Sequence, residues 1–203
     1  MKIISLGSNC EVGFFIKHNF SSSEYYPFDW IWSNIDFVIN TFENDYFEFT
    51  DCEKLNAVWV PPHQHTYIFN NNCNGTEDRI CSAVSVHDAD FHQQPEYILN
   101  IPKINEKYKR RFTRLYNVLN SNENVILIRK VLDTNQGAIK KTYDSAEKLN
   151  RLSMIFTKFP AKITLCIVDS EGTVSKNNLN KNILMFTSLN ELRIHLKKLP
   201  KES

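Results

Sequence analysis

The chain has 203 residues, with 24 Lys plus Arg against 23 Asp plus Glu. This length favours one domain with a sizeable core, and the balanced charge argues neither for nor against a nucleic-acid partner. No apolar run approaches the length of a membrane span, and the N-terminus lacks the charged and apolar regions of a targeting segment. We therefore expect a soluble, cytoplasmic protein with a single domain over residues 1–203.

The cysteine and glycine content argues against two classes of protein, those held by disulfides and those with Gly-rich nucleotide-binding loops. The five cysteines are odd in number and have no close repeated spacing, which makes a poor disulfide framework. Glycine is scarce, at 5 residues, and neither a dinucleotide fingerprint nor a Walker sequence is present. We expect no cofactor.

The first predicted unit is a buried strand that feeds a helix. Residues 3–6 form a short apolar run, which is typical of a buried strand. Ser8 or Asn9 can then cap a helix over residues 11–19. The apolar face of this helix carries Val12, Phe15 and Ile16. Cys10 is therefore predicted to lie in the first turn.

Two interpretations of Cys10 follow from this position. Unpaired backbone N–H groups and the positive end of the helix dipole favour the thiolate, which is the reactive form. Free cysteine is also among the most buried residue types, so Cys10 can equally be a small apolar residue packed under the turn. These residues alone leave both interpretations open.

The next segment, Tyr26-Pro-Phe-Asp-Trp30, places a carboxylate among aromatic side chains, where it needs a partner. Asp29 is a candidate to orient a histidine or to accept a hydrogen bond from a substrate. It is equally a candidate to cap a helix that begins near Ser33 or Asn34. The spacing of apolar residues predicts that this helix continues to Phe47.

Short strand-like runs follow, at residues 57–60, 66–69 and 81–86. They are separated by Pro61-Pro62 and by an Asn-rich turn, a pattern that predicts antiparallel hairpins. We expect a β-hairpin insertion over about residues 50–92. It contains several potential metal ligands, namely His63, His65, Cys73, Cys81, His87 and His92. Their spacing is that of no known structural zinc module, and we expect no metal.

His87 and Asp88 follow an apolar run and so lie at a predicted strand end, where catalytic side chains are commonly presented. A histidine there can accept the proton of Cys10 and later return it, because its ordinary pKa lies near neutrality. The alternative is that the two residues only end a strand and cap the next turn.

A strong helix candidate spans residues 103–120 and carries basic residues on one face, an arrangement that usually marks a solvated surface. Arg129 closes the predicted strand 125–128 at the end where α/β sheets bind ligands. Guanidinium groups offer paired donors to carboxylate or phosphate. Arg111, Arg114 and Arg129 are therefore candidates for holding an anionic substrate.

The last third alternates helix and strand, with a helix over 143–159, strands at 163–168 and 183–186, and a final helix from Ser188 to Leu199. Such alternation implies crossovers and a mostly parallel sheet covered on both faces. We expect a three-layer α/β fold, with the hairpin insertion added to it.

Two motifs stand out together, Ser5-Leu-Gly-Ser-Asn-Cys10 and Tyr26-Pro-Phe-Asp-Trp30. With His87-Asp88, the arginines of residues 110–114 and Ile126-Leu-Ile-Arg129, they resemble the putative papain-like cysteine peptidase family, known from bacteria and large DNA viruses. The resemblance spans roughly residues 1–130, and the first two motifs are its most specific part. A viral chain would act in the host cytoplasm.

The resemblance implies a cysteine-dependent hydrolase or acyl transferase. Cys10 and His87 become the leading dyad, and Asp29 and Asp88 compete to orient the imidazole. Backbone N–H groups near Cys10, with Ser8 and Asn9, would bind the substrate and stabilise an oxyanion. The expected substrate is a peptide or an anionic small molecule.

An alternative class is a binding module without catalysis, or a glycosyl or phosphoryl transferase. In that interpretation Trp30 and the three arginines 111, 114 and 129 hold an anionic ligand. The reactivity of Cys10 discriminates between the two, because only the enzyme needs a thiol with a depressed pKa.

Overall fold

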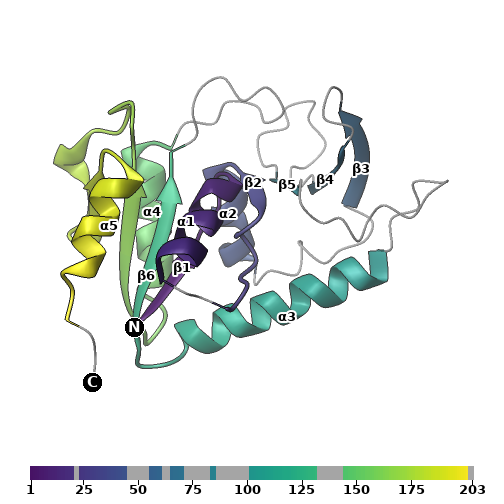
Figure 1. Ribbon diagram of the computed structural model, residues 1–203, viewed down its shortest axis with the longest axis horizontal. Helices are drawn as coiled ribbons and strands as arrows, with labels where there is room; N and C mark the ends of the chain where they lie inside the picture. Colours follow the sequence, from purple (N-terminus) through teal and green to yellow (C-terminus); the bar gives the residue numbers. More distant parts are fainter. Residues whose placement is uncertain are drawn as a thin grey trace.

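The structure is a computed structural model that describes residues 1–20, 23–44, 55–60, 65–70, 83–85, 101–131 and 144–200 (Figure 1). Its helices are α1 (Cys10–Phe20), α2 (Ile35–Glu43), α3 (Ile101–Leu119), α4 (Ala146–Phe156) and α5 (Leu189–Lys197). Its strands are β1 (Lys2–Ser5), β2 (Ile31–Ser33), β3 (Leu55–Val60), β4 (His65–Asn70), β5 (Ala83–Ser85), β6 (Asn124–Lys130), β7 (Lys162–Val168) and β8 (Ile183–Phe186). A short 3₁₀ helix lies at Lys176–Asn178.

The first sheet is four-stranded and entirely parallel, in the order β1-β6-β7-β8. Ile4 is paired with Leu127, and Leu127 with Leu165, so the apolar centres of three strands are in register. Parallel strands must be joined by crossovers, and here the crossovers carry the helices. The predicted α/β fold with a parallel sheet is confirmed.

Helices cover both faces of this sheet, because side chains alternate between the faces along each strand. Val125 and Leu127 pack into a large core with α2, α3 and α4, while Ile126 and Ile128 pack into a second core with α1 and α5. The sheet therefore forms the middle of three layers. Buried β6, in the interior of the sheet, has apolar side chains on both faces, as expected for a parallel strand.

A second, antiparallel sheet has the order β2-β5-β4-β3. The sequence did not predict β2, where we expected only the approach to a helix. Three residues give too short a run to show strand periodicity, and the partner of β2 lies about fifty residues later, with Ser33 opposite Ala83. The chain on either side of β3, β4 and β5 lies outside the described residues, so the bounds of the predicted insertion remain a prediction.

Helix α3 is the longest helix and runs along the molecule from the first sheet toward the second (Figure 1). Tyr108, Phe112, Leu115 and Leu119 are buried in the larger core, so the face of α3 opposite the basic residues packs against the first sheet. Among the described residues, none of the helices combines the length and the apolar character needed to cross a membrane.

Candidate active site

The turn between β1 and α1 has an unusual backbone. Gly7 and Ser8 both adopt left-handed conformations, with φ of 78° and 83°. A Cβ on Gly7 would lie 2.4 Å from the Oγ of Ser33, and the N–H of Ser8 donates to that same oxygen at 3.4 Å. Glycine is therefore required at position 7 by both the conformation and the close contact. The turn lies directly against the end of β2.

Helix α1 begins at Cys10, in agreement with the predicted first-turn position. Of the two predicted caps, Asn9 acts as the cap, since its Oδ1 accepts a hydrogen bond from the N–H of Glu11 at 3.1 Å. The Glu11 carboxylate accepts from the Nζ of Lys130 at 2.5 Å and from the Nδ2 of Asn9 at 3.4 Å. This network joins the start of α1, beside Cys10, to the carboxyl end of β6.

Cys10 is partly exposed. It lies at the carboxyl edge of the parallel sheet, where ligand sites of open α/β sheets are found. Cys166 offers a contrast, because it is buried in β7 and burial raises the pKa of its thiol to about 12. Next to Cys10, the buried Oγ of Ser8 has no hydrogen-bond partner among the described residues.

Beneath the turn lies Arg129, which is completely buried. Its Nε and Nη2 donate to the two carboxylate oxygens of Asp144 at 2.6 and 2.9 Å. Its remaining contacts are backbone carbonyls, that of Leu6 at 3.3 Å and that of Ser33 at 3.2 Å. A single guanidinium thus ties together the ends of β1, β2 and β6 and the start of α4.

Asp29 is also buried, with 7% of its surface exposed. Its Oδ2 accepts a hydrogen bond from the N–H of Tyr26 at 2.7 Å, which closes the turn 26–29. The cap of α2 is Asn34, whose Oδ1 accepts from the N–H of Phe37 at 2.8 Å. The helix-capping alternative for Asp29 was therefore wrong. Burial raises the pKa of Asp29 to about 6, against the lowering effects of the Tyr26 N–H and of Arg111.

Helix α1, which begins at the end of the first motif, meets the second motif at Gly13. A Cβ on this residue would lie 2.2 Å from the backbone oxygen of Asp29, so α1 and the segment 26–30 approach more closely than any larger residue allows. Gly13 is one turn of α1 beyond Cys10. The helix that begins with the thiol is thus held directly against the motif that supplies the carboxylate.

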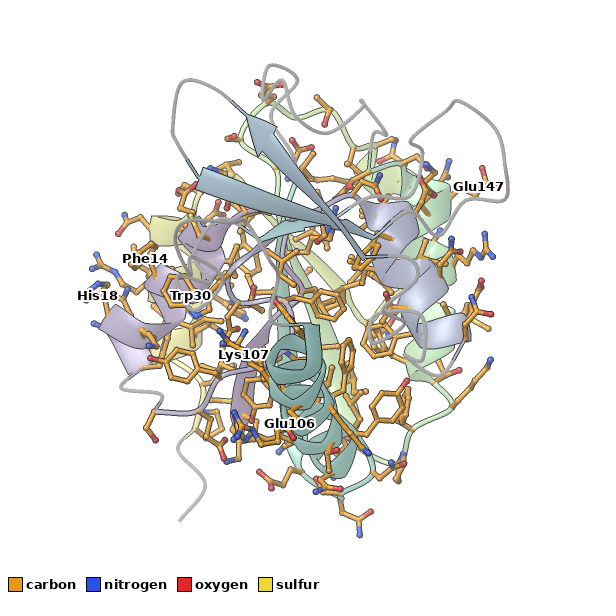
Figure 2. The ribbon with its side chains drawn as sticks, turned by 90° about the vertical axis from the view of Figure 1, so that its right-hand side faces the viewer. Phe14, His18, Trp30, Glu106, Lys107 and Glu147 are labelled. Atoms are coloured by element: carbon orange, nitrogen blue, oxygen red, sulfur yellow. The ribbon has the colours of Figure 1, made fainter. Side chains whose placement is uncertain are left out.

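Basic and aromatic side chains gather beside α1. Arg114 donates to the backbone oxygen of Tyr25, and the Cζ of Arg111 lies 5.6 Å from the centre of the Tyr25 ring. Trp30 packs edge-on against Phe14, with ring centres 4.7 Å apart. Figure 2 shows both rings next to His18 on α1, with Lys107 on the neighbouring α3.

The structure therefore separates the predicted site residues into two groups. Ser8, Asn9 and Cys10 surround the β1–α1 turn, with Arg129 below it. Asp29, Trp30, Arg111 and Arg114 lie together beside α1. His87 and Asp88 are outside the described residues, as are the other potential metal ligands of the insertion except His65, which begins β4. In the part of the chain that is described, no group of three or more His, Cys, Asp or Glu side chains is placed to hold a metal ion.

Sequence reasoning missed three contributors, namely Gly13, Ser33 and Asp144. Gly13 did give a signal, since a glycine inside a helical pattern usually has a packing or functional reason. Ser33 and Asp144 gave none. Asp144 lies 15 residues from Arg129, and Ser33 lies 25 residues from Ser8, so only the fold brings each pair together.

The fold and the site define a class: an α/β protein with a partly exposed thiol at the first turn of the helix that follows its first strand. Residues 1–168 match the family described as "Putative papain-like cysteine peptidase". The chain belongs to this family.

One curated relative is "Uncharacterized protein R408" of Acanthamoeba polyphaga mimivirus. It is 25% identical over 174 residues, which cover 81% of this chain and 76% of the viral protein. No solved structure gives a significant match.

Proposed function

We propose that the protein is a cysteine-dependent hydrolase or acyl transferase acting on peptide or related acyl substrates, with Cys10 as the nucleophile. The observation that carries the proposal is the partly exposed Cys10 thiol at the first residue of α1. Free N–H groups and the helix dipole stabilise a thiolate at this position. Family membership supports the same chemistry.

In the proposed reaction, the Cys10 thiolate attacks the carbonyl carbon and forms a C–S bond. The C–N bond to the leaving amine then breaks, and His87, which took the thiol proton, returns it to that amine. Water attacks the resulting thioester and releases the acid and the free thiol; another nucleophile in place of water gives acyl transfer. The N–H groups at the start of α1, with Asn9 and Ser8, are proposed to hold the oxyanion.

The placement of β5 supports His87 as the partner of Cys10. β5 pairs with β2, and its last residue, Ser85, lies opposite Ile31. A Cβ on Gly7 would lie 3.4 Å from the backbone oxygen of Ile31, so the β1–α1 turn borders the same strand. His87 follows Ser85 by two residues, which span at most about 7 Å. We propose Asp29 or Asp88 as the residue that orients the imidazole.

Arg129 is proposed as a positioning residue, since its donors are directed at Asp144 and at the carbonyls of Leu6 and Ser33. Arg111 and Arg114 support the second candidate function, which is binding of an anionic ligand without catalysis. The observation that favours it is the buried Nη1 of Arg111, which has no hydrogen-bond partner among the described residues.

Alkylation with iodoacetamide across pH, read for each cysteine by peptide mass mapping, tests the proposal. We expect Cys10 to react at a pH at least about one unit below that of free cysteine. Cys166 is an internal control, because its buried thiol with a pKa of about 12 should stay unmodified in the folded protein. A Cys10 that titrates like free cysteine would favour the binding module. Turnover of an identified substrate by a Cys10→Ala variant would remove the proposal.

A further inference from the structure

The exposed face of α1 continues from the thiol. Cys10, Phe14, Lys17 and His18 are spaced i, i+4, i+7 and i+8, which places them on one stripe of the helix. The opposite face, with Val12, Phe15 and Ile16, is buried in the smaller core. Seven residues of helix span about 10 Å. The thiol and the stripe therefore share one surface of the molecule.

Two of the few exposed large apolar side chains in the described chain meet on this surface. Phe14 is 43% exposed and Tyr25 is 39% exposed. Trp30 lies between them, with its ring centre 4.7 Å from that of Phe14 and 6.4 Å from that of Tyr25. Apolar side chains that gather in this way, with polar groups around them, are typical of binding surfaces. Figure 2 shows Phe14 and Trp30 at the edge of the molecule.

Basic side chains lie over two of these aromatic rings, those of Tyr25 and Trp30. The Nζ of Lys17 lies 3.6 Å from the centre of the Tyr25 ring, 5.3 Å from that of Trp30, and also donates to the Tyr25 hydroxyl. The Cζ of Arg111 is 5.6 Å from the ring of Tyr25. The negative faces of aromatic rings attract cations, and this attraction fixes the position of otherwise mobile basic side chains.

The charge of this surface comes from Lys17 and Arg114, which are partly exposed, and from Arg111, which is buried, with 8% of its surface exposed. Within the described residues, Lys17, Arg111 and Arg114 form no ion pair with a carboxylate. Elsewhere basic side chains do find such partners, as Lys130 does with Glu11, Lys148 with Asp36 and Arg151 with Glu43. Two carboxyl groups do lie near these cations. That of Asp29 is buried and bonded to backbone, and the charges of Arg111, Lys17 and Arg114 partly offset the rise of its pKa on burial. The pKa of Glu24 is lowered mainly by its hydrogen bonds with Tyr26 and Lys2, with a smaller effect of Arg114. The surface thus offers the positive charge of the partly exposed Lys17 and Arg114 beside exposed apolar rings, to which an anionic partner with apolar groups is complementary.

We propose that the surface formed by Phe14, Lys17, Tyr25, Trp30, Arg111 and Arg114 binds an acidic segment of a polypeptide substrate. This inference rests on the proposed function of Cys10. An extended peptide advances about 3.3 Å per residue, so the distance from Cys10 to Lys17 places the acidic residue about three positions from the attacked carbonyl. A nucleic acid fits less well, because Lys17 covers the Tyr25 ring on which a base would stack and nucleic acids lack the acyl carbon that a thiol attacks.

Peptide binding by the full chain with Cys10→Ala tests the inference without interference from turnover. Fluorescence anisotropy would compare a labelled ten-residue peptide of Glu, Phe and Ala with the same peptide carrying Lys in place of Glu. We expect the acidic peptide to bind at least about tenfold more tightly. Lys17→Glu should remove this preference, and Lys17→Arg should keep it. The control is Lys181→Glu, which makes the same charge change in an exposed turn and should leave the affinity for the acidic peptide within about twofold of the parent value.

Each other outcome has a defined meaning. Equal affinity for the two peptides, or equal losses from Lys17→Glu and Lys181→Glu, would overturn the inference. Tighter binding of oligothymidylate than of the acidic peptide would assign the surface to nucleic acid and also overturn it. Cys10-dependent cleavage of peptides without a preference for acidic residues would remove the inference and keep the proposed function. Acidic-peptide binding without any turnover by the unmodified chain would remove the proposed function and keep the surface.

Discussion

Arg129 and Asp144 form a bidentate ion pair in which both side chains are completely buried. The guanidinium is the last inward-facing group of β6 before the strand ends, and Asp144 stands immediately before the cap of α4. The pair therefore holds in place the backbone beneath the β1–α1 turn, since the same guanidinium donates hydrogen bonds to the carbonyls of Leu6 and Ser33. A buried charge is tolerated here only because its partner is present.

Asp144→Asn is expected to destabilise the protein by roughly 3–5 kcal/mol, because the substitution leaves the Arg129 charge buried without its counterion. Urea unfolding followed by circular dichroism measures the change. Glu43→Gln is the matched control, since Glu43 also binds an arginine through two hydrogen bonds, but Arg151 is 58% exposed. That pair should contribute less than about 1 kcal/mol. Equal losses in the two variants would contradict the structural role of Arg129.

Gly13→Ala tests the close contact between α1 and the segment 26–30. Alanine would normally stabilise a helix interior by up to about 1 kcal/mol relative to glycine. Here the alanine Cβ would lie 2.2 Å from the backbone oxygen of Asp29, so α1 and the segment 26–30 would have to move apart. We expect a net destabilisation of roughly 1–3 kcal/mol in urea unfolding. Asn117→Ala, at an exposed position of α3, should change stability by at most about 0.5 kcal/mol. A stabilised Gly13→Ala protein would show that the contact is not tight.

The sequence predicted the parallel sheet because its signals are local. Each strand of that sheet contains a short apolar run, and the flanking helices carry apolar residues at helical spacing, so the alternation appears without any knowledge of partners. The position of Cys10 at the start of α1 followed from the same local reasoning. The start of the last helix at Ser188 also followed from local reasoning: Ser188 caps α5, with its Oγ accepting a hydrogen bond from the N–H of Glu191 at 3.1 Å.

What escaped prediction depends on long-range contacts. Arg129 was predicted to bind a ligand because it ends a strand. No feature of the neighbouring sequence indicated that Asp144 would be its ion-pair partner. Asp29 was given a capping role as one alternative because helix starts are local signals, yet Asn34 caps that helix and Asp29 bonds to Tyr26 instead. Proximity of buried polar groups is a property of the fold, and a single sequence does not reveal it.

Asp29 makes stability depend on pH in a direction that can be measured. Burial raises the pKa of this carboxyl from 3.8 to about 6. Between these values the folded protein holds a proton that the unfolded chain has released, so the free energy of unfolding falls as pH rises from about 4 to about 6. The contribution is on the order of 1 kcal/mol per pH unit. Asp29→Asn keeps an oxygen for the Tyr26 N–H but has no charge to bury.

We therefore expect the Asp29→Asn variant to lose this slope and to equal or exceed the parent in stability at pH 7, as measured by urea unfolding at several pH values. Asp36→Asn is the control, because Asp36 is partly exposed and paired with Lys148, and its substitution should leave the slope between pH 4 and 6 in place. If Asp29 also orients the imidazole of His87, Asp29→Asn should be more stable than the parent but less active. The substitution removes a carboxylate that is costly to bury, and with it the group that orients the imidazole. Unchanged pH dependence in Asp29→Asn would show that this carboxyl is not desolvated, and unchanged activity would leave the orienting role to Asp88.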